Sequence, residues 1–167
     1  VCGKAELMRR FRPERPADLC FARGTFNAHP YVMGAMAAFL DHLESPQAQQ
    51  LYAGLDAQQD GRAAALNARC EAAGLPVRVA NMSTVWTVNY TQPSRYNWML
   101  QYYLRDHGVA LSWVGTGRFI FSLNWHEADF EDFSQRFLAA AQAMQAGGWW
   151  HHEAGASNRA LRRSVLR

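Results

Sequence analysis

The segment from residue 127 to residue 145 carries the clearest helical periodicity in the chain. Its apolar residues recur at spacings of three and four, which places them on one face of a helix: Phe130, Phe133, Phe137, Leu138, Ala141 and Met144. Glu127 and Asp129 stand in the first turn, where the helix dipole favours negative charge, and Gly147-Gly148 ends the helix. Such an apolar stripe is typical of a helix that packs one face against other parts of a fold.

The segments that can cover this face are four predicted strands. Residues 77–80 and 84–91 are rich in β-branched and aromatic residues and flank a turn at 81–83. Alternation in the second places Val85 and Thr87 on one face and Trp86 and Val88 on the other. Residues 109–113 and 118–123 predict two more strands.

Further helices are predicted at 31–43, 47–73 and 95–107, with a shorter one at 6–11 and a last one at 158–166. Gly61 lies inside the long second helix and is expected to weaken or bend it. Gly74 and Gly108 are expected to end helices. With helices and paired strands in this order, the sequence predicts an α+β fold with a mostly antiparallel sheet of three or four strands under helices.

The composition is that of a globular protein, since 49% of the 167 residues are hydrophobic and 19% are charged. No apolar run approaches the ~20 residues of a membrane span, and no signal peptide is visible. Three widely spaced cysteines support neither a disulfide framework nor a zinc site. Reduced thiols in a cytoplasmic protein are the simplest interpretation. The net charge of +3 is mild for a nucleic-acid binder.

A second informative stretch joins an Arg- and Pro-rich segment to the helix predicted at 31–43. Gly24 allows the backbone to approach a ligand closely, and Thr25 and Asn27 add short hydrogen-bonding side chains. Pro30 suits the first position of a helix. Free N–H groups, a hydroxyl and a helix N-terminus together suit a phosphate. An ordinary loop-to-helix junction would have the same residues, so both interpretations stay open at this point.

In its setting, Gly-Thr-Phe-Asn-Ala-His-Pro, followed by a Met- and Ala-rich helix, resembles the Gly-Thr-x-x-x-x-Pro segment of the class III, fold-type I aminotransferases. The glutamate-1-semialdehyde aminomutase branch is the most similar. Asp106-His-Gly-Val-Ala-Leu and Phe121-Ser-Leu-Asn-Trp-His-Glu-Ala-Asp-Phe are similar to later passages of that family, in the same order. His126 stands where that family usually has a threonine cap. The resemblance runs from about Gly3 to Met144.

The resemblance implies the C-terminal domain of a fold-type I enzyme that uses pyridoxal 5'-phosphate (PLP). Residues 1–30 would end the large domain and carry the phosphate loop, 31–146 would form the α+β domain, and 147–167 would be a tail. Gly24, Thr25 and, less directly, Asn27 would contact the phosphate of PLP held by the other subunit of a homodimer. The other implied partners are the missing large domain of the same chain and a small amino or keto acid, with no nucleic acid and no membrane.

A lysine decides whether such a chain can act alone. PLP chemistry needs a lysine that holds the cofactor covalently and moves protons. In the family that the chain resembles, this lysine lies roughly 30 residues before the Gly-Thr pair, which is ahead of Val1. The one lysine, Lys4, is predicted to be an exposed surface charge. We therefore expect a piece of an aminotransferase or aminomutase that has no catalytic residue of its own and is inactive alone.

Arg118 is the candidate for substrate binding. Related aminotransferases carry a strand arginine hereabouts that holds the substrate carboxylate through two hydrogen bonds. When the chain is aligned with that family on Ser122-Leu123, Arg118 falls one residue away from the position of the family's arginine. A shift of one residue places a side chain on the opposite face of a strand. Gly117 occupies a position that is acidic in the semialdehyde branch. An exposed arginine on an edge strand is the alternative.

The other candidate site residues, histidines and aromatic residues, give weaker evidence of a function. The six histidines show no metal-ligand spacing, so no metal site is predicted; His29 could line the cofactor entrance or be an ordinary loop histidine. The aromatic residues between 90 and 121 predict core packing more than base stacking. The alternative function is a stand-alone, non-catalytic α+β module that binds protein or RNA. The substrate, and the choice between transfer and intramolecular exchange, stay open.

Overall fold

The structure is a computed structural model that describes residues 3–8, 29–111, 117–152 and 154–165. It forms two compact units, Val1–Gln50 and Leu51–Arg167. The domain boundaries expected at residues 30 and 146 stay a prediction. No helix among the described residues has both the length and the apolar character that crossing a membrane requires.

The first unit is helical. It contains α1 (Ala5–Met8), α2 (Pro30–Leu43) and most of α3 (Pro46–Tyr52). Pro30 takes the first position of α2, as predicted. The Ser45 hydroxyl accepts a hydrogen bond from the Ala48 N–H at 3.2 Å, which caps α3.

The second unit is built on a three-stranded antiparallel sheet in the order β1-β2-β3. The strands are β1 (Val77–Met82), β2 (Val85–Tyr90) and β3 (Arg118–Ile120). Ser83 lies in the turn between β1 and β2 with φ +50°, in the left-handed region. The alternation predicted for β2 is confirmed, because Trp86 and Val88 are buried while their neighbours are more exposed.

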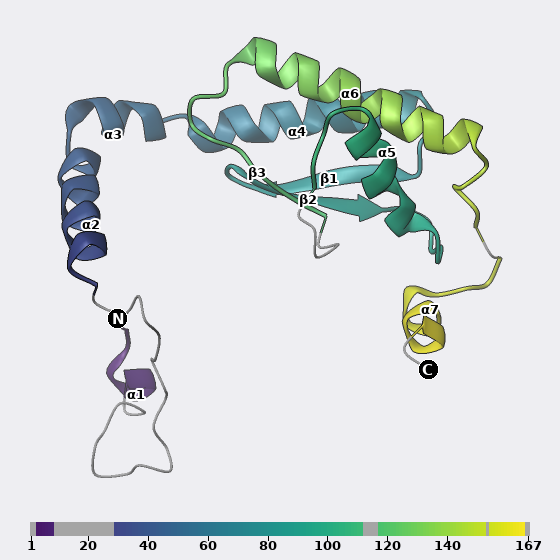
Figure 1. The fold of residues 1–167 in the computed structure, drawn as a ribbon, viewed down its shortest axis with the longest axis horizontal. Coiled ribbons are helices and arrows are strands. Elements are labelled where there is room, and N and C mark those ends of the chain that lie inside the picture. The colour runs from purple at the N-terminus through teal and green to yellow at the C-terminus, as the bar shows by residue number, and fades with distance from the viewer. Residues whose placement is uncertain (1–2, 9–28, 112–116, 153, 166–167) are drawn as a thin grey trace. The chain divides into compact units, whose positions relative to one another are not determined.

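Helices cover one face of this sheet. Figure 1 shows α4 (Leu55–Ala72) and α6 (Glu127–Ala146) side by side on the same face. After a 3-10 turn, η3 (Asn97–Met99), α5 (Leu100–Asp106) packs against α6. The chain then continues past α6 to α7 (Asn158–Val165). The predicted α+β class, with a small antiparallel sheet under helices, is confirmed.

The core between helices and sheet is aromatic. Trp86 is fully buried, and its ring centroid lies 5.0 Å from that of Phe121 and 5.6 Å from that of Phe130. The apolar face predicted for 127–145 is the face of α6 that packs here. Gln59 is buried with this cluster and accepts a hydrogen bond from the Trp86 indole N–H at 3.1 Å. Cys70 is also buried, and burial raises the pKa of its thiol to about 11.

The prediction of one long helix at 47–73 is wrong in one respect, because the structure divides this stretch into α3 and α4. The break falls at Gly54, the N-cap of α4, and not at Gly61. Gly61 stays helical because buried residues on either side, Gln59 and Ala63, fix this stretch of α4 against the core. Tertiary packing therefore outweighs the low helix propensity of glycine here.

Three other expectations need correction. Residues 109–111 form no strand, although Val109 and Leu111 are buried; residues 112 and 113 lie outside the described part. β3 ends at Ile120, because Ser122 begins a turn in which its carbonyl accepts from the Trp125 N–H. The helix predicted at 95–107 is shorter, since its first turn is 3-10.

Candidate functional site

The three residues predicted to bind phosphate, Gly24, Thr25 and Asn27, lie outside the described residues, so their role stays a prediction. The described structure resumes at His29, the N-cap of α2, whose side chain makes no capping hydrogen bond. The N-terminus of α2 is therefore uncapped by its own N-cap side chain, and a helix N-terminus of this kind can receive an anion. The His29 ring lies 5.6 Å from that of Tyr31, between centroids.

Lys4, the only lysine of the chain, is exposed, directly ahead of α1. Its carbonyl accepts hydrogen bonds from the N–H groups of Leu7 and Met8. Among the described residues, no group of three or more metal-ligating side chains is close enough together to hold a metal ion.

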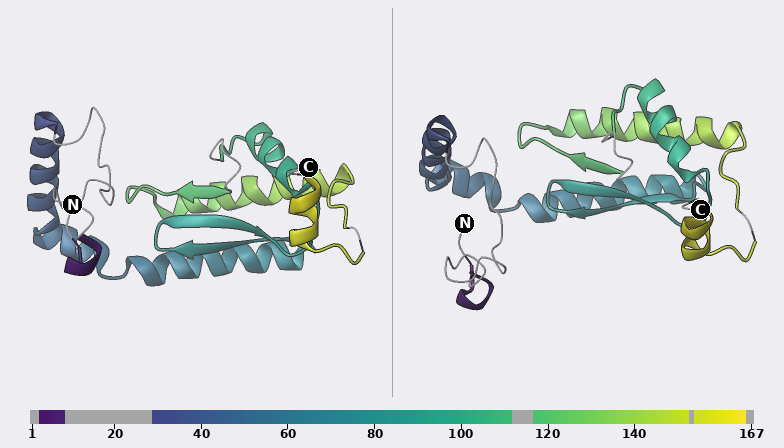
Figure 2. Two further views of the ribbon diagram at one scale, coloured as in Figure 1. Left: turned by 90° about the horizontal axis from the view of Figure 1, so that it is seen from below. Right: turned by 60° about the horizontal axis from the view of Figure 1, so that its bottom comes forward.

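Within the described part of the chain, the face of the sheet that points away from α4 and α6 keeps most of its side chains exposed. Figure 2 (left) views the second unit from this side. Along β1 the buried residues are Val77 and Val79, whereas Arg78, Ala80 and Met82 are exposed. We call this the open sheet face; its members alternate with the core residues of each strand, and they are Arg78, Ala80, Met82, Val85, Thr87, Asn89, Arg118 and Ile120.

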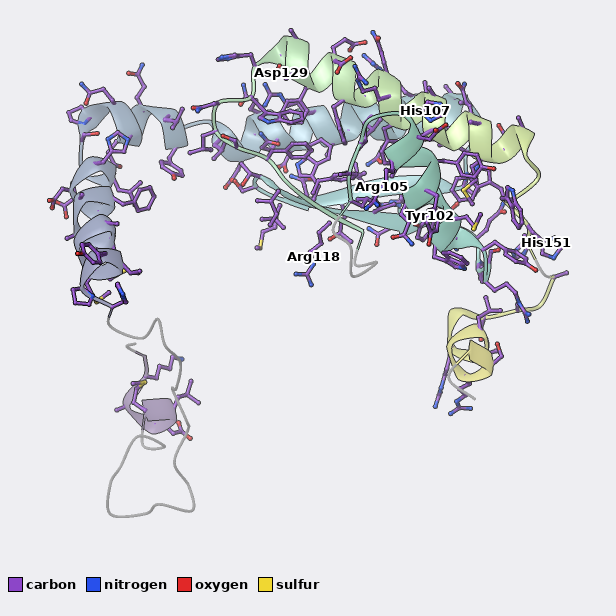
Figure 3. All side chains as sticks on the ribbon, viewed as in Figure 1. Tyr102, Arg105, His107, Arg118, Asp129 and His151 are labelled. Atoms are coloured by element: carbon purple, nitrogen blue, oxygen red, sulfur yellow. The ribbon has the colours of Figure 1, made fainter. Side chains whose placement is uncertain are left out.

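Arg118 belongs to this open sheet face. Its neighbour Phe119 is buried in the core, while Arg118 itself is exposed and stands directly opposite Thr87 of β2. In Figure 3 its side chain points away from α6 and from the labelled Asp129. The slip of one residue discussed above therefore does not turn Arg118 into the core. Its position is compatible with both an anion-binding and a solvent-exposed arginine.

A hollow of about 580 Å³ runs along the outer edge of β3. Its lining includes Arg118, Phe119, Trp125, Asp129, Asp132 and Arg136. The two carboxylates already have local partners: Asp132 accepts from Arg136 at 2.7 Å, and Asp129 accepts from the His126 N–H at 2.7 Å. The hydrogen bond to Asp132 raises the pKa of Arg136. Asp129 thus stabilises the start of α6 from the third position after the N-cap His126.

Arg78 is a residue that the sequence reasoning missed. It lies on the open sheet face, paired with Asn89 of β2, so that β2 separates it from Arg118. The signal that could have found it is the period-two alternation of 77–80, where valines flank the arginine on both sides.

None of the known protein-family models matches the sequence. A curated relative, glutamate-1-semialdehyde 2,1-aminomutase from Nitratidesulfovibrio vulgaris (strain DP4), is 33% identical over 89 residues, which cover 53% of this chain and 19% of the relative. Over this part of its length the chain is similar to a glutamate-1-semialdehyde aminomutase, which is the branch that the resemblance in its sequence named.

Solved transaminases share the fold of this chain over most of its length. An ω-transaminase from Sphaerobacter thermophilus matches with a TM-score of 0.63 at 20% identity, over 86% of this chain and 34% of that one. A β-phenylalanine aminotransferase from Variovorax paradoxus gives 0.58 at 23%, over 92% and 36%. A transaminase with PLP bound gives 0.65 at 22%, over 89% and 35%. The chain thus spans about a third of these solved proteins and about a fifth of the curated relative.

Proposed function

We propose that the chain is the C-terminal part of a PLP-dependent aminotransferase or aminomutase of class III. Within it, Gly24, Thr25 and Asn27 bind the cofactor phosphate, and Arg118 binds the carboxylate of an amino or keto acid. The observation that carries the proposal is the placement of Arg118: it stands on the uncovered face of a sheet whose fold matches a third of several transaminases.

The described residues fit the phosphate end of the cofactor. Pro30 begins α2 without needing an N–H partner, and no side chain of the N-cap occupies the N-terminus of the helix. The positive end of the helix dipole then favours a phosphate held by the preceding loop. PLP, when bound, supplies an electron sink for carbanion chemistry.

The protein's own contribution at the substrate end is orientation. A guanidinium stays charged at any physiological pH and can hold a carboxylate with two parallel hydrogen bonds. Arg118 is carried by a strand, which is more rigid than a loop, so it can fix one end of the substrate while chemistry proceeds at the other.

Uncovered apolar surface supports the view that more protein packs onto this chain. No residue of α2 is buried, although its apolar positions include Met33, Met36, Phe39 and Leu40. Such surface is typical of an interaction site. We propose that the large domain of the same protein and a second subunit cover surfaces of this kind, and that the chain alone is inactive because the cofactor-binding lysine is elsewhere.

The test starts from the coding sequence upstream of Val1. We expect the reading frame to continue and to encode a lysine about 30 residues before the Gly-Thr pair. In that longer protein, Arg118→Gln should raise KM for the amino acid about 10- to 100-fold, because a hydrogen bond to a charged group contributes about 1.5–3 kcal/mol. Arg105→Gln, an exposed arginine of α5, is the matched control and should change KM little.

Three results would contradict the proposal. One is amino transfer by the 167-residue chain alone with PLP. Another is an unchanged KM in Arg118→Gln. The third is salt-dependent RNA binding by the chain, which would favour the stand-alone interaction module.

A further inference from the structure

An exposed stripe runs along the segment that contains η3 and α5. Its members are the side chains of Arg95, Trp98, Tyr102 and Asp106. The first two lie one turn apart, because the N–H groups of Asn97 and Met99 donate to carbonyls three residues back and the chain winds here with about three residues per turn. Trp98 touches Tyr102, with ring centroids 5.6 Å apart. Tyr102 and Asp106 are four residues apart in α5, so the four residues form one line, which we call the α5 stripe.

The opposite side of this segment holds it to the fold, so the α5 stripe faces outward. Leu100 and Leu104 are fully buried in the core, where α5 packs against α6. Trp98 and Tyr102, the second of which is labelled in Figure 3, are by contrast 52% and 54% exposed. Tryptophan, tyrosine and arginine are the residues that contribute most binding energy at protein interfaces. Two large aromatic side chains in contact on the surface, next to an arginine, therefore indicate a docking surface.

The two ends of the α5 stripe carry opposite charges, which set the kind of partner that fits. Within the described part of the chain, Arg62, Arg69 and Arg136 each have a carboxylate partner. Neither Arg95 nor Asp106 forms an ion pair with another described residue. They do not pair with each other, because eleven residues of helical chain separate them by roughly 18 Å. Both charges are therefore available to a partner that presents the opposite charges in the reverse order.

A second copy of the chain presents that order when its own α5 stripe runs antiparallel to the first. A two-fold axis through the middle of the stripe places each Arg95 opposite the Asp106 of the other copy. An ion pair then lies at each end, with the aromatic side chains of both copies between them. A nucleic-acid strand fits less well, because Asp106 repels phosphate and the two rings already pack edge to face, at 74°, which limits stacking of bases.

We propose that the α5 stripe binds a second copy of this chain around a two-fold axis. The inference does not rest on the proposed function, because the stripe contains none of the residues assigned to cofactor or substrate. It is also separate from the subunit contact proposed for Gly24 and Thr25, which uses other residues. A stripe this short buries less than the ~800 Å² per partner of a stable interface, so we expect weak, reversible dimerisation with a Kd between about 10 μM and 1 mM.

The experiment measures self-association of the full 167-residue chain by sedimentation equilibrium at one ionic strength. Met36→Gln with Phe39→Gln is the background throughout, so that these exposed apolar side chains of α2 do not contribute. We expect Arg95→Glu and Asp106→Arg each to weaken dimerisation about tenfold, because each change places like charges opposite one another at both ends of the contact. The two changes together should restore most of the affinity, because the charges are then exchanged and opposite again.

Two further variants show which part of the surface is responsible. Trp98→Gln removes an aromatic side chain from the centre of the contact and should weaken dimerisation about tenfold or more. Glu71→Arg makes the same change of charge as Asp106→Arg at an exposed position in the last turn of α4, and it should leave dimerisation unchanged.

The charge exchange keeps the test independent of folding, because a variant that had lost its fold would not regain the contact through a second substitution. A chain that stays monomeric up to about 1 mM, the upper limit of the expected Kd, overturns the inference. So do single charge changes without effect, or a double change that associates no better than the single ones. A monomeric chain that binds single-stranded oligo(U) would assign the α5 stripe to nucleic acid instead.

Discussion

The side chain of Asn67 closes the outer edge of β1. Its amide N–H donates to the Val79 carbonyl at 2.9 Å, and its carbonyl accepts from the Val79 N–H at 2.7 Å. Val79 lies on an edge strand, where such groups would otherwise be open to water or to another strand. One side chain of α4 thus takes the place of two ladder hydrogen bonds.

Asn67→Ala should therefore destabilise the second unit. Both Val79 groups lose their partner in a partly buried site, and we expect a loss of about 1–3 kcal/mol in the free energy of unfolding. Urea denaturation followed by tryptophan fluorescence measures it. Gln58→Ala, at an exposed position of the same helix, is the control and should stay within about 0.5 kcal/mol of the parent. Equal stabilities for the two variants would refute this role of Asn67.

Contacts of this kind show where sequence reasoning stops. Asn67 and Val79 are 12 residues apart, Gln59 and Trp86 are 27 apart, and Arg62 and Glu127 are 65 apart. Periodicity identifies which residues are apolar, but a polar side chain that serves a distant partner has the same pattern as one that faces water. Arg62 is an example: its side chain is only 7% exposed and stacks on Phe130 at 3.9 Å.

At the scale of elements, paired charges join α4 to α6. Arg62 binds Glu127, and Arg69 binds both carboxylate oxygens of Glu131 at 2.9 and 2.6 Å. Both pairs advance in the same direction along the two helices, so α4 and α6 run parallel. The hydrogen bonds from Arg69 and then from Gln135 lower the pKa of Glu131 to about 2. The same contact raises the pKa of Arg69.

This lowered pKa predicts a pH dependence of stability. In the unfolded chain a glutamate has a pKa of about 4.3, so the pair stabilises the folded state above that pH, and its contribution is lost as pH falls towards about 2. Glu131→Gln should lower the unfolding midpoint at pH 7, and its difference from the parent should shrink between these two values. Glu71→Gln, which removes an exposed carboxylate of α4 that has no ion pair among the described residues, is the control. A pH-independent difference for Glu131→Gln would contradict the pair.

Element ends that depend on one residue were predictable, and those that depend on packing were not. Gly74 and Gly108 have φ of +64° and +79° and follow the ends of α4 and α5, as their position in the sequence predicted. By contrast, 109–111 has the alternation of a strand, with Val109 and Leu111 buried, but takes no ladder partner in the described structure. Alternation reports burial, whereas a strand also needs a neighbour to pair with.

At the scale of the whole molecule, the two units differ in how they use their apolar residues. The second unit buries Trp86 and five phenylalanines in one continuous cluster: Phe119, Phe121, Phe130, Phe133 and Phe137. In the first unit, α2 presents Met36 and Phe39 to solvent, at 48% and 54% exposure. The periodicity of α2 was predicted correctly, but a helical stripe alone does not reveal whether its covering partner belongs to the same piece of chain.

This contrast predicts that α2 can be changed without unfolding the sheet. Met36→Gln combined with Phe39→Gln should reduce the binding of a hydrophobic dye and the tendency to self-associate, because the stripe loses two exposed apolar side chains. The near-ultraviolet circular dichroism of the second unit should not change. Phe137→Ala, in the fully buried core, should instead cost about 3–5 kcal/mol and lower its unfolding midpoint. Loss of the near-ultraviolet signal in the α2 variant would mean that the stripe supports the sheet, and the surface assigned to a further domain or subunit would have to be sought elsewhere.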